Sequence, residues 1–423
     1  MNEEFLYYLW QYHFQGKCLN GTQNETFCIL HPGQRNTNSG PDFFNARIKI
    51  GTTLWAGNVE IHVRSSDWYK HGHQHDHQYD NVILHVVYTD DHPVVRRNGE
   101  RLPTLVLKEK FDEKLFHTYR NFLASKRWIP CENLITRAGH FHITNWLYRL
   151  AIERLERKAR EMERLLASEK NDFREMFYQK LLENYGFQIN NQAFAQLARR
   201  LPYSVLAKHK NHLLQIEALL FGQAGMLNQP FSDNYPHQLQ QEYRFLSKKY
   251  NLTALDPGIW RFMRTHPSNF PTLRIAQFAG LFYRSTSLLQ KMLESKQLTD
   301  VINLLQTQAS VYWKTHYQWE KSSPLHSTKM GKTSIFILLI NTIIPFLFVY
   351  SRQMEQPELS EKALNWLAQL PAEKNRITRH FSALGLIPDN ALQSQALLRL
   401  KKYYCNPKQC LHCSIGHQLL KSL

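Results

Sequence analysis

The chain has 423 residues, and its 52 Lys and Arg against 35 Asp and Glu give a net charge of +17. Hydrophobic residues make up 43% of the sequence, which is enough for a packed core and excludes an intrinsically disordered chain. The length allows one large domain or two to three ordinary ones. The positive charge favours an anionic partner, nucleic acid before a membrane surface; a basic soluble protein without such a partner is the plainer alternative.

The first part of the chain is predicted to form one helix followed by strands. Apolar residues recur at spacings of three and four in EEFLYYLWQYHF, which predicts a helix over residues 3–14. Alternating apolar residues then predict strands in FFNARIKI, TLWAGNVEIHV, NVILHVVYTD and RLPTLVLKE. Asn98-Gly99 is typical of a hairpin turn.

Two carboxylates can meet where the first two of these strands pair. In residues 55–64, alternation places Glu60 and His62 on one face. A three-residue turn at 51–53 would put Asp42 opposite His62 and diagonal to Glu60, about 7–8 Å away, a gap that one divalent ion can bridge. A two-residue turn would point Asp42 to the other face unless a bulge corrected it. The simpler alternative is an acidic turn residue and an exposed glutamate.

A burst of histidines follows in DWYKHGHQHDHQYDN, residues 67–81. Four of them alternate, and in a loop they could wrap Zn²⁺, Ni²⁺ or Mn²⁺. A polar surface loop that picks up metal incidentally is the alternative. His85 lies inside an apolar strand, where a hydrogen-bonded core residue is more typical than a metal ligand.

The periodicity becomes helical after residue 140. Residues 144–169 carry a rough apolar stripe, and residues 171–186 begin with a cap, Asn171 or Asp172, and end at Gly186. Further helices are predicted near 190–200, 209–222, 237–249, 271–293, 297–307, 334–351, 359–371 and 389–404. The sequence therefore predicts two domains, residues 1–125 and 126–423, with the boundary within 120–142.

The chain carries no feature that predicts export or a membrane anchor. The start, MNEEFLYYLW, is acidic where a signal peptide is basic. The most apolar run, residues 335–350, is shorter than the ~20 residues that span a bilayer and contains Pro345, so we expect a buried helix. A cytoplasmic protein without membrane contact follows.

Three cysteines near the C-terminus, Cys405, Cys410 and Cys413, follow the spacing C-x4-C-x2-C. Such spacing lets one loop wrap a tetrahedral centre, and without an export signal clustered cysteines indicate metal more than disulfides. Both Zn²⁺ and a [4Fe–4S] cluster fit, and reduced, unliganded thiols are the alternative.

The fourth ligand of such a centre must come from elsewhere. Cys131 is the leading candidate, and His412 and His417 are alternatives. Cys18 and Cys28 are interpreted as ordinary buried or hairpin thiols.

Several short segments of this sequence resemble motifs of known families. Pro41-Asp42 followed by Glu60-Ile61-His62 resembles the PD-(D/E)XK motif of restriction-endonuclease-like nucleases. The words NSGPDF, WAGNVEIH, SSDW and NVILHVVY also resemble an uncharacterised bacterial family, a domain of unknown function, along most of the chain. The nuclease resemblance covers about the first 120 residues. It implies an α/β (α+β) N-terminal domain with a mixed, restriction-endonuclease-like sheet, followed by an all-α helical domain.

The nuclease resemblance implies metal-dependent hydrolysis of phosphodiester bonds in DNA. Asp42, Glu60 and the carbonyl of Ile61 would hold Mg²⁺ or Mn²⁺. His62 stands where the family usually has Lys, which puts catalysis rather than the fold in question. Glu4, on the opening helix, could be an accessory carboxylate.

The resemblance also bears on the histidines and cysteines. His71, His73 and Asp76 follow the W-x-x-H-x-H pattern of the resembled family and could contact the scissile phosphate or donate a proton. Some nucleases of the superfamily carry an iron–sulfur cluster on C-terminal cysteines plus one distant cysteine, an arrangement that Cys131 would complete.

Two other functions compete with a nuclease. The first is a non-catalytic nucleic-acid-binding or scaffold protein on a degraded nuclease fold, which His62 in place of Lys favours. The second is a metalloenzyme centred on His71, His73 and Asp76 with a substrate other than nucleic acid.

Overall fold

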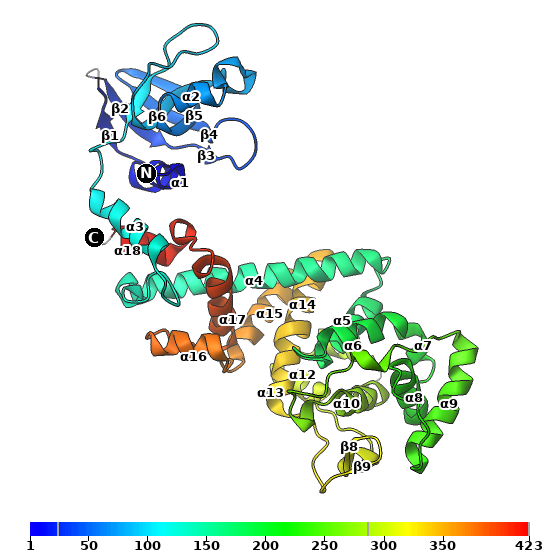
Figure 1. The fold of residues 1–423 in the computed structure, drawn as a ribbon. Helices are drawn as coiled ribbons and strands as arrows, with labels where there is room; N and C mark the ends of the chain where they lie inside the picture. Colours follow the sequence, from blue (N-terminus) through cyan, green and yellow to red (C-terminus); the bar gives the residue numbers. More distant parts are fainter. Residues whose placement is uncertain (23–24, 286, 422–423) are drawn as a thin grey trace. The chain divides into compact units, whose positions relative to one another are not determined.

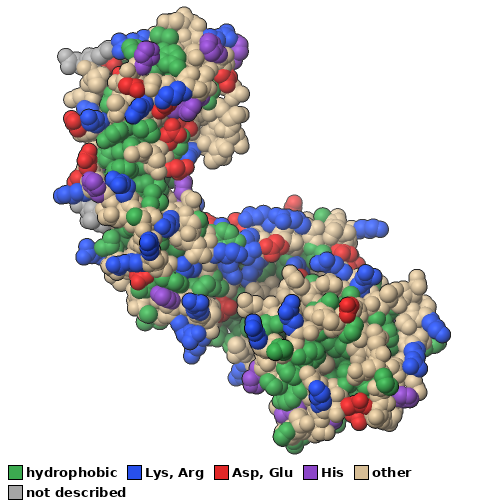
Figure 2. All heavy atoms as spheres, viewed as in Figure 1, with side chains coloured by type: hydrophobic (Ala, Val, Ile, Leu, Met, Phe, Trp, Pro, Cys, Tyr) green, Lys and Arg blue, Asp and Glu red, His purple; other side chains and the backbone are tan. Residues whose placement is uncertain are grey.

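The computed structural model describes residues 1–22, 25–285 and 287–421. It is 55% helical and 13% strand, with a mixed sheet followed by a largely helical region, so the predicted fold class is confirmed at this level. The chain forms two compact units: unit 1 is Met1–Trp146, Leu384–Leu386 and Leu400–Leu423, and unit 2 is Leu147–Ala383 and Ile387–Arg399. The domains predicted at 1–125 and 126–423 stay a prediction. Lys and Arg side chains are spread over the visible face of each unit (Figure 2).

Unit 1 is built on one mixed sheet (Figure 1). Its strands run in the order β1-β2-β4-β5-β6-β7, with β3 also paired to β4. Pairs from β1 to β5 are antiparallel, whereas β5, β6 and β7 are parallel. The bounds are β1 Cys18–Asn20, β2 Thr26–His31, β3 Gln34–Arg35, β4 Phe43–Ile50, β5 Thr53–Arg64, β6 Val82–Thr89 and β7 Thr104–Val106.

The register between β4 and β5 follows the second of the two predicted alternatives. Ile50 pairs with Thr53, so the turn has two residues rather than three, and a bulge is needed to keep Asp42 on the face of Glu60. The register then shifts by one before Phe43, which pairs with Val59. Asn45 takes a left-handed φ of 59° within this shift, a conformation that Asn tolerates better than most residues. The bulge therefore restores the facing of Asp42 that the short turn alone would reverse.

The centre of β5 is buried on both faces because strands flank it and helical segments cover it. Val59 and Ile61 are fully buried, but Glu60 and His62 on the other face are also only 5% and 2% exposed. The parallel connection from β5 to β6 crosses this region through α2 (Asp67–Lys70) and two short 3₁₀ turns, His73–His75 and His77–Tyr79. The histidine burst thus lies in a helical crossover.

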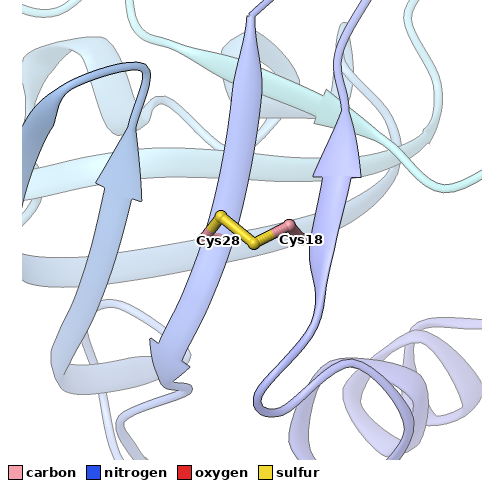
Figure 3. Close-up of a disulfide and its surroundings, with 2 residues drawn as sticks. All are labelled: Cys18 and Cys28. Carbon is pink, nitrogen blue, oxygen red and sulfur yellow. A yellow bond between two sulfur atoms is a disulfide. The ribbon is translucent and has the colours of Figure 1, made fainter.

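Cys18 and Cys28 form a disulfide across the β1–β2 hairpin (Figure 3). They are directly paired in the register, with Cα atoms 3.9 Å apart. The interpretation of these residues as thiols is wrong, because the sequence did not reveal the β1–β2 pairing that brings them together.

Unit 1 also contains helices from both ends of the chain. The opening helix α1 begins after Asn2, whose side chain accepts a hydrogen bond from the Phe5 amide, and it continues as a π-helical segment. The bounds are α1 Glu3–Tyr8, the π segment Leu9–His13, α3 Glu113–Ala124 and α18 Ser414–Lys421. The turn predicted at Asn98-Gly99 is confirmed by the bridge between Val95 and Arg101 and by the positive φ of Gly99.

In its described residues, unit 2 combines helices with one short hairpin, β8 His316–Gln318 and β9 Lys321–Ser322. The predicted cap of α5 is confirmed, since Asp172 accepts from the amides of Arg174 and Glu175 and Gly186 ends the helix. The long helix α4, His140–Ser168, begins in unit 1 and continues in unit 2. The other helices are α5 Phe173–Tyr185, α6 Asn191–Arg200, α7 Tyr203–Ala207, α8 Leu213–Gln223, α9 Asn234–Tyr250, α10 Pro271–Arg284, α11 Leu288–Glu294, α12 Leu298–Leu305, α13 Lys332–Leu338, α14 Ile344–Gln353, α15 Pro357–Gln369, α16 Arg376–Ala383 and α17 Ala391–Leu400.

The most apolar run forms a continuous helical stretch, Lys332–Gln353, of 22 residues. Among the described residues it is the one helix long and apolar enough to cross a membrane, so the length argument against spanning is wrong. Two thirds of its apolar window (67%) is nevertheless buried within the protein, as in the core helix of a globular unit. Pro345 sits near the start of α14, where a π-helical segment precedes it.

Candidate functional site

Asp42 and Glu60 face each other across the bulged end of β4 and β5. Continuing the Phe43–Val59 pair by one residue places Asp42 directly opposite Glu60, not diagonal to it. Each carboxylate accepts a hydrogen bond from a backbone amide of the facing segment. The amide of Asp42 donates to Glu60 Oε2 at 3.0 Å, and the amide of Ile61 donates to Asp42 Oδ2 at 2.9 Å. These reciprocal bonds fix both carboxylates and leave one oxygen of each outside the backbone pairing.

Burial and nearby negative charge disfavour the ionised form of both carboxylates. Burial, then the charge of Glu60, raises the pKa of Asp42 to about 7, although the Ile61 amide opposes the rise. Burial also raises the pKa of Glu60 to about 8, opposed by the Asp42 amide. Two buried carboxylates that resist ionisation side by side form a site that a cation would complete.

The opening helix contributes two residues, Glu3 and Tyr7, to the surroundings of Asp42 that the sequence pattern did not predict. The hydroxyl of Tyr7 is hydrogen-bonded to Asp42 and also lies within reach of Glu3. Burial raises the pKa of Glu3, while nearby His71 lowers it. Glu3 and Tyr7 share a helix face at positions i and i+4, but Glu4 and Tyr8 have the same spacing, so the sequence carries no signal that selects Glu3.

The predicted accessory carboxylate, Glu4, points elsewhere. It pairs with Arg35 at 3.2 Å and with His412 at 3.5 Å, and its side chain is half exposed. The carboxylate of α1 that adjoins the site is therefore that of Glu3.

Three histidines cluster beside Glu60. His62 Nε2 lies 3.1 Å from His71 Nδ1, and the ligand atoms of His62, His71 and His73 all lie within 4.8 Å of one another. Glu60 Oε1 adjoins this group, 3.5 Å from His62 Nε2 and 3.3 Å from His73 Nε2. The structure thus joins the acid pair and part of the histidine burst into one site.

His62 carries no positive charge near neutral pH. Burial, then the neighbouring His85, His73 and His71, lowers the pKa of His62 to about 2, so its ring is neutral near pH 7. Its Nδ1 lies 2.8 Å from His85 Nε2. His85 is fully buried in β6, which confirms the prediction of a hydrogen-bonded core histidine.

The crossover directs only part of the histidine burst into the site. Gly72 has a φ of 75°, and this left-handed turn separates His71 from His73. Tyr79 stacks on the ring of His73 with centroids 3.8 Å apart, and Trp68 meets it edge-on. These contacts hold His73 against Glu60.

The remaining crossover residues have other contacts. His77 contacts Asp80 and Arg97 on the surface, and His75 is exposed. Asp76 caps the second 3₁₀ turn by accepting from the Gln78 amide at 2.9 Å, although its charge acts on His73. Asp76 therefore shapes the crossover and does not join the three histidines.

The four predicted cysteine ligands gather at a second place in unit 1. Cys405, Cys410 and Cys413 are buried and Cys131 is partly buried; all four are free thiols. Cys131, Cys405 and Cys410 each feel the charge of Cys413, and burial raises the pKa of all four thiols. The alternative ligands, His412 and His417, contact Glu4 and the Leu411 carbonyl instead.

Donors surround one of these sulfurs. The amides of Ile415 and Gly416 hydrogen-bond to the sulfur of Cys413, and the indole of Trp146 lies close to it. A Cβ added to Gly416 would lie 2.1 Å from the Cys410 carbonyl oxygen, so only glycine fits this turn. Two amide donors aimed at one buried sulfur suit a thiolate better than a thiol.

The fold and site define a two-unit protein with a mixed sheet, a buried acid pair and an adjoining histidine group. A family model described as "Protein of unknown function (DUF2851)" matches residues 3–376, and the chain belongs to that family. No curated protein and no solved structure matches the chain.

Proposed function

We propose that the protein is a divalent-metal-dependent nuclease that hydrolyses phosphodiester bonds in DNA. The single observation that carries the proposal is the acid pair, in which the Asp42 and Glu60 carboxylates lie opposite each other on adjacent strands. The resemblance to the PD-(D/E)XK motif leads us to expect this arrangement. The same resemblance is the ground for proposing that the protein is bacterial.

The residues present fit Mg²⁺ or Mn²⁺. Hard cations prefer oxygen ligands, and Asp42, Glu60 and the carbonyl of Ile61 supply them. A bound divalent ion would remove the cost of ionising two adjacent buried carboxylates, would lower the pKa of a water molecule and would stabilise negative charge on the phosphate.

The protein's own groups would do the rest. Tyr7 donates to Asp42 and orients that carboxylate, and the two backbone amides hold the pair in register. His71 is exposed, so its ring can reach a bound substrate and contact the scissile phosphate. His62 is a neutral hydrogen-bonding group in this scheme, not a replacement for the charge of Lys.

The excess positive charge supports a nucleic-acid partner. A net charge of +17 would draw polyanions by long-range attraction that weakens with salt. We propose a cytoplasmic location, where such a substrate would be found. The Cys18–Cys28 disulfide favours an oxidising compartment instead, since disulfides are rare in reducing compartments such as the cytoplasm. Alkylation of thiols at the moment of cell lysis, followed by mass spectrometry, would show which state the pair has.

The proposal is tested with purified protein, single- and double-stranded DNA and RNA, and Mg²⁺ or Mn²⁺. We expect metal-dependent cleavage of DNA by the wild type and at least ~100-fold slower cleavage by Asp42→Asn, because one oxygen ligand and its charge are lost. The matched control is Asp80→Asn, an exposed aspartate of the same unit. Equal rates for Asp42→Asn and the wild type would remove the proposal.

A scaffold protein is the second candidate function. The neutral His62 favours it, because the charge that lysine supplies in the resembled nucleases is missing. DNA binding by fluorescence anisotropy, equal in the wild type and Asp42→Asn and without cleavage under any metal condition, would establish this alternative.

We also propose that the four thiols hold a [4Fe–4S] cluster rather than Zn²⁺. In a tetrahedral zinc site, Zn–S bonds of ~2.3 Å bring sulfurs to ~3.8 Å from one another. Among the described residues only the three histidines have ligand atoms within 4.8 Å of one another, so no three of these sulfurs approach that closely. An iron–sulfur cube separates its ligands more widely.

The cluster is tested by anaerobic purification with iron, sulfide and zinc analysis. We expect about four iron and four sulfide per chain and a brown colour that Cys131→Ser and Cys410→Ser abolish. Stoichiometric zinc without sulfide would overturn the assignment, as would metal-free protein.

A further inference from the structure

We propose that His62, His71 and His73, together with Glu60, form a second, nitrogen-rich cation site beside the acid pair. It would bind a first-row transition-metal ion such as Mn²⁺, Fe²⁺ or Zn²⁺ and would reject Mg²⁺. The assignment rests on the proposed nuclease function for its catalytic meaning, but as a binding site it can be measured without any substrate.

The first argument is convergence. Nitrogens of His62, His71 and His73 lie within 4.8 Å of one another, although they come from a strand and from a helical crossover. Glu60 Oε1 closes one side, 3.3 Å from His73 Nε2 and 3.5 Å from His62 Nε2. Atoms that ligate one tetrahedral ion at ~2.0–2.2 Å lie roughly 3.3–3.6 Å apart, which matches the two distances from Glu60 Oε1 to the histidine nitrogens.

The second argument is that one ring nitrogen of the group, His73 Nε2, lacks a hydrogen-bond partner. His73 Nε2 is buried, and within the described part of the chain it has no hydrogen-bond partner, because its approach to Glu60 lacks hydrogen-bond geometry. The His73 side chain is only 10% exposed. A buried nitrogen without a partner costs free energy, and an ion at this point would satisfy it.

The third argument is orientation by neighbouring residues. Metal-binding histidines commonly donate their other N–H to a fixed acceptor. If His62 Nδ1–H donates to His85 Nε2, at 2.8 Å, the lone pair of His62 Nε2 faces His71 and His73. Tyr79 and Trp68 fix the ring of His73. The ligands are therefore held in place before an ion binds.

The donor set decides the kind of ion. Imidazole nitrogen suits zinc, iron and similar ions, whereas Mg²⁺ requires oxygen ligands in near-octahedral geometry. Three nitrogens and one carboxylate oxygen therefore select against Mg²⁺. The acid pair, with its oxygen ligands, is the position for a hard cation, and Glu60 contributes to both places.

The experiment titrates Co²⁺ into the full-length, metal-depleted protein and follows visible absorption. Co²⁺ reports nitrogen and oxygen ligands in the visible range, and a thiolate charge-transfer band would reveal binding at the cysteines instead. We expect one Co²⁺ per chain without the thiolate band, undisplaced by excess Mg²⁺. His71→Ala and His73→Gln should each weaken binding at least ~10-fold.

The matched control is His75→Ala, an exposed histidine of the same crossover. It should bind Co²⁺ as the wild type does, and circular dichroism of all variants separates loss of ligand from loss of fold. Binding that is unchanged in both site variants, or that appears only with a thiolate band, overturns the proposal. Co²⁺ binding through the histidines without DNA cleavage would contradict the nuclease function and leave this site standing; Mg²⁺-dependent cleavage by a protein that binds no Co²⁺ through the histidines would do the reverse.

Discussion

Replacing Glu60 by Gln should stabilise the metal-free protein at alkaline pH. The amide oxygen of Gln can still accept from the Asp42 amide, now 3.0 Å from Glu60 Oε2, and its NH₂ can face the nitrogens of His62 and His73. The substitution therefore keeps the packing and removes only the charge.

The magnitude follows from the pKa of Glu60, which burial raises from 4.5 to about 8. Between these values the folded state binds more protons than the unfolded state, so the free energy of unfolding falls as pH rises through the window from 4.5 to 8. At ~1.36 kcal/mol per pH unit the loss approaches ~5 kcal/mol above pH 8. We expect Glu60→Gln to regain roughly 2–5 kcal/mol at pH 9 and close to nothing at pH 4.

The assay is urea unfolding in a chelator, read out by hydrogen exchange of peptides from β5. This local readout is needed because the chain has two compact units, whose transitions would mix in a global signal. Glu100→Gln, which changes an exposed carboxylate paired with Arg96, is the control and should shift stability by less than ~0.5 kcal/mol. A Glu60→Gln protein no more stable than wild type at pH 9 would refute the reasoning.

Substitutions at four other positions test separate parts of the structure. Asn45→Ala should cost roughly 1 kcal/mol in thermal unfolding and Asn45→Gly much less, because the β4 bulge requires a positive φ; equal losses would contradict this. Tyr7→Phe removes a donor to Asp42 and should raise the pH at which metal-dependent cleavage begins, seen as a shifted pH–rate profile. Cys18→Ser should lower the free energy of unfolding by roughly 2–3 kcal/mol under oxidising conditions, and by nothing with reductant present. His85→Gln should weaken Co²⁺ binding about 10–100-fold by disturbing the orientation of His62.

The sequence predicted the central strands and the acid pair but not the geometry that joins them. Alternation in β5 correctly put Glu60 and His62 on one face, since period-two burial is a local property. The register with β4 depends on the turn length and on a bulge at Asn45, and neither follows from hydrophobic pattern. The protein uses a two-residue turn together with this bulge, and the two irregularities together keep Asp42 opposite Glu60.

The residues around the acid pair were harder to predict because they come from distant segments. Tyr7 and Glu3 reach Asp42 only through the packing of α1, and nothing in the periodicity of that helix distinguishes Glu3 from Glu4. Cys131 was easier to predict as a neighbour of the C-terminal thiols, because the chain offers few other cysteines as a fourth ligand.

The measurement that tests the central claim most directly is the rate of Mg²⁺- or Mn²⁺-dependent DNA cleavage by wild type, Glu60→Gln and Asp80→Asn under one set of conditions. The acid pair predicts cleavage by the wild type and by Asp80→Asn, abolished by chelator, with Glu60→Gln slower by at least ~100-fold although without metal it is at least as stable as the wild type. Cleavage by Glu60→Gln at the wild-type rate would contradict the account, and so would the absence of metal-dependent cleavage from all three proteins.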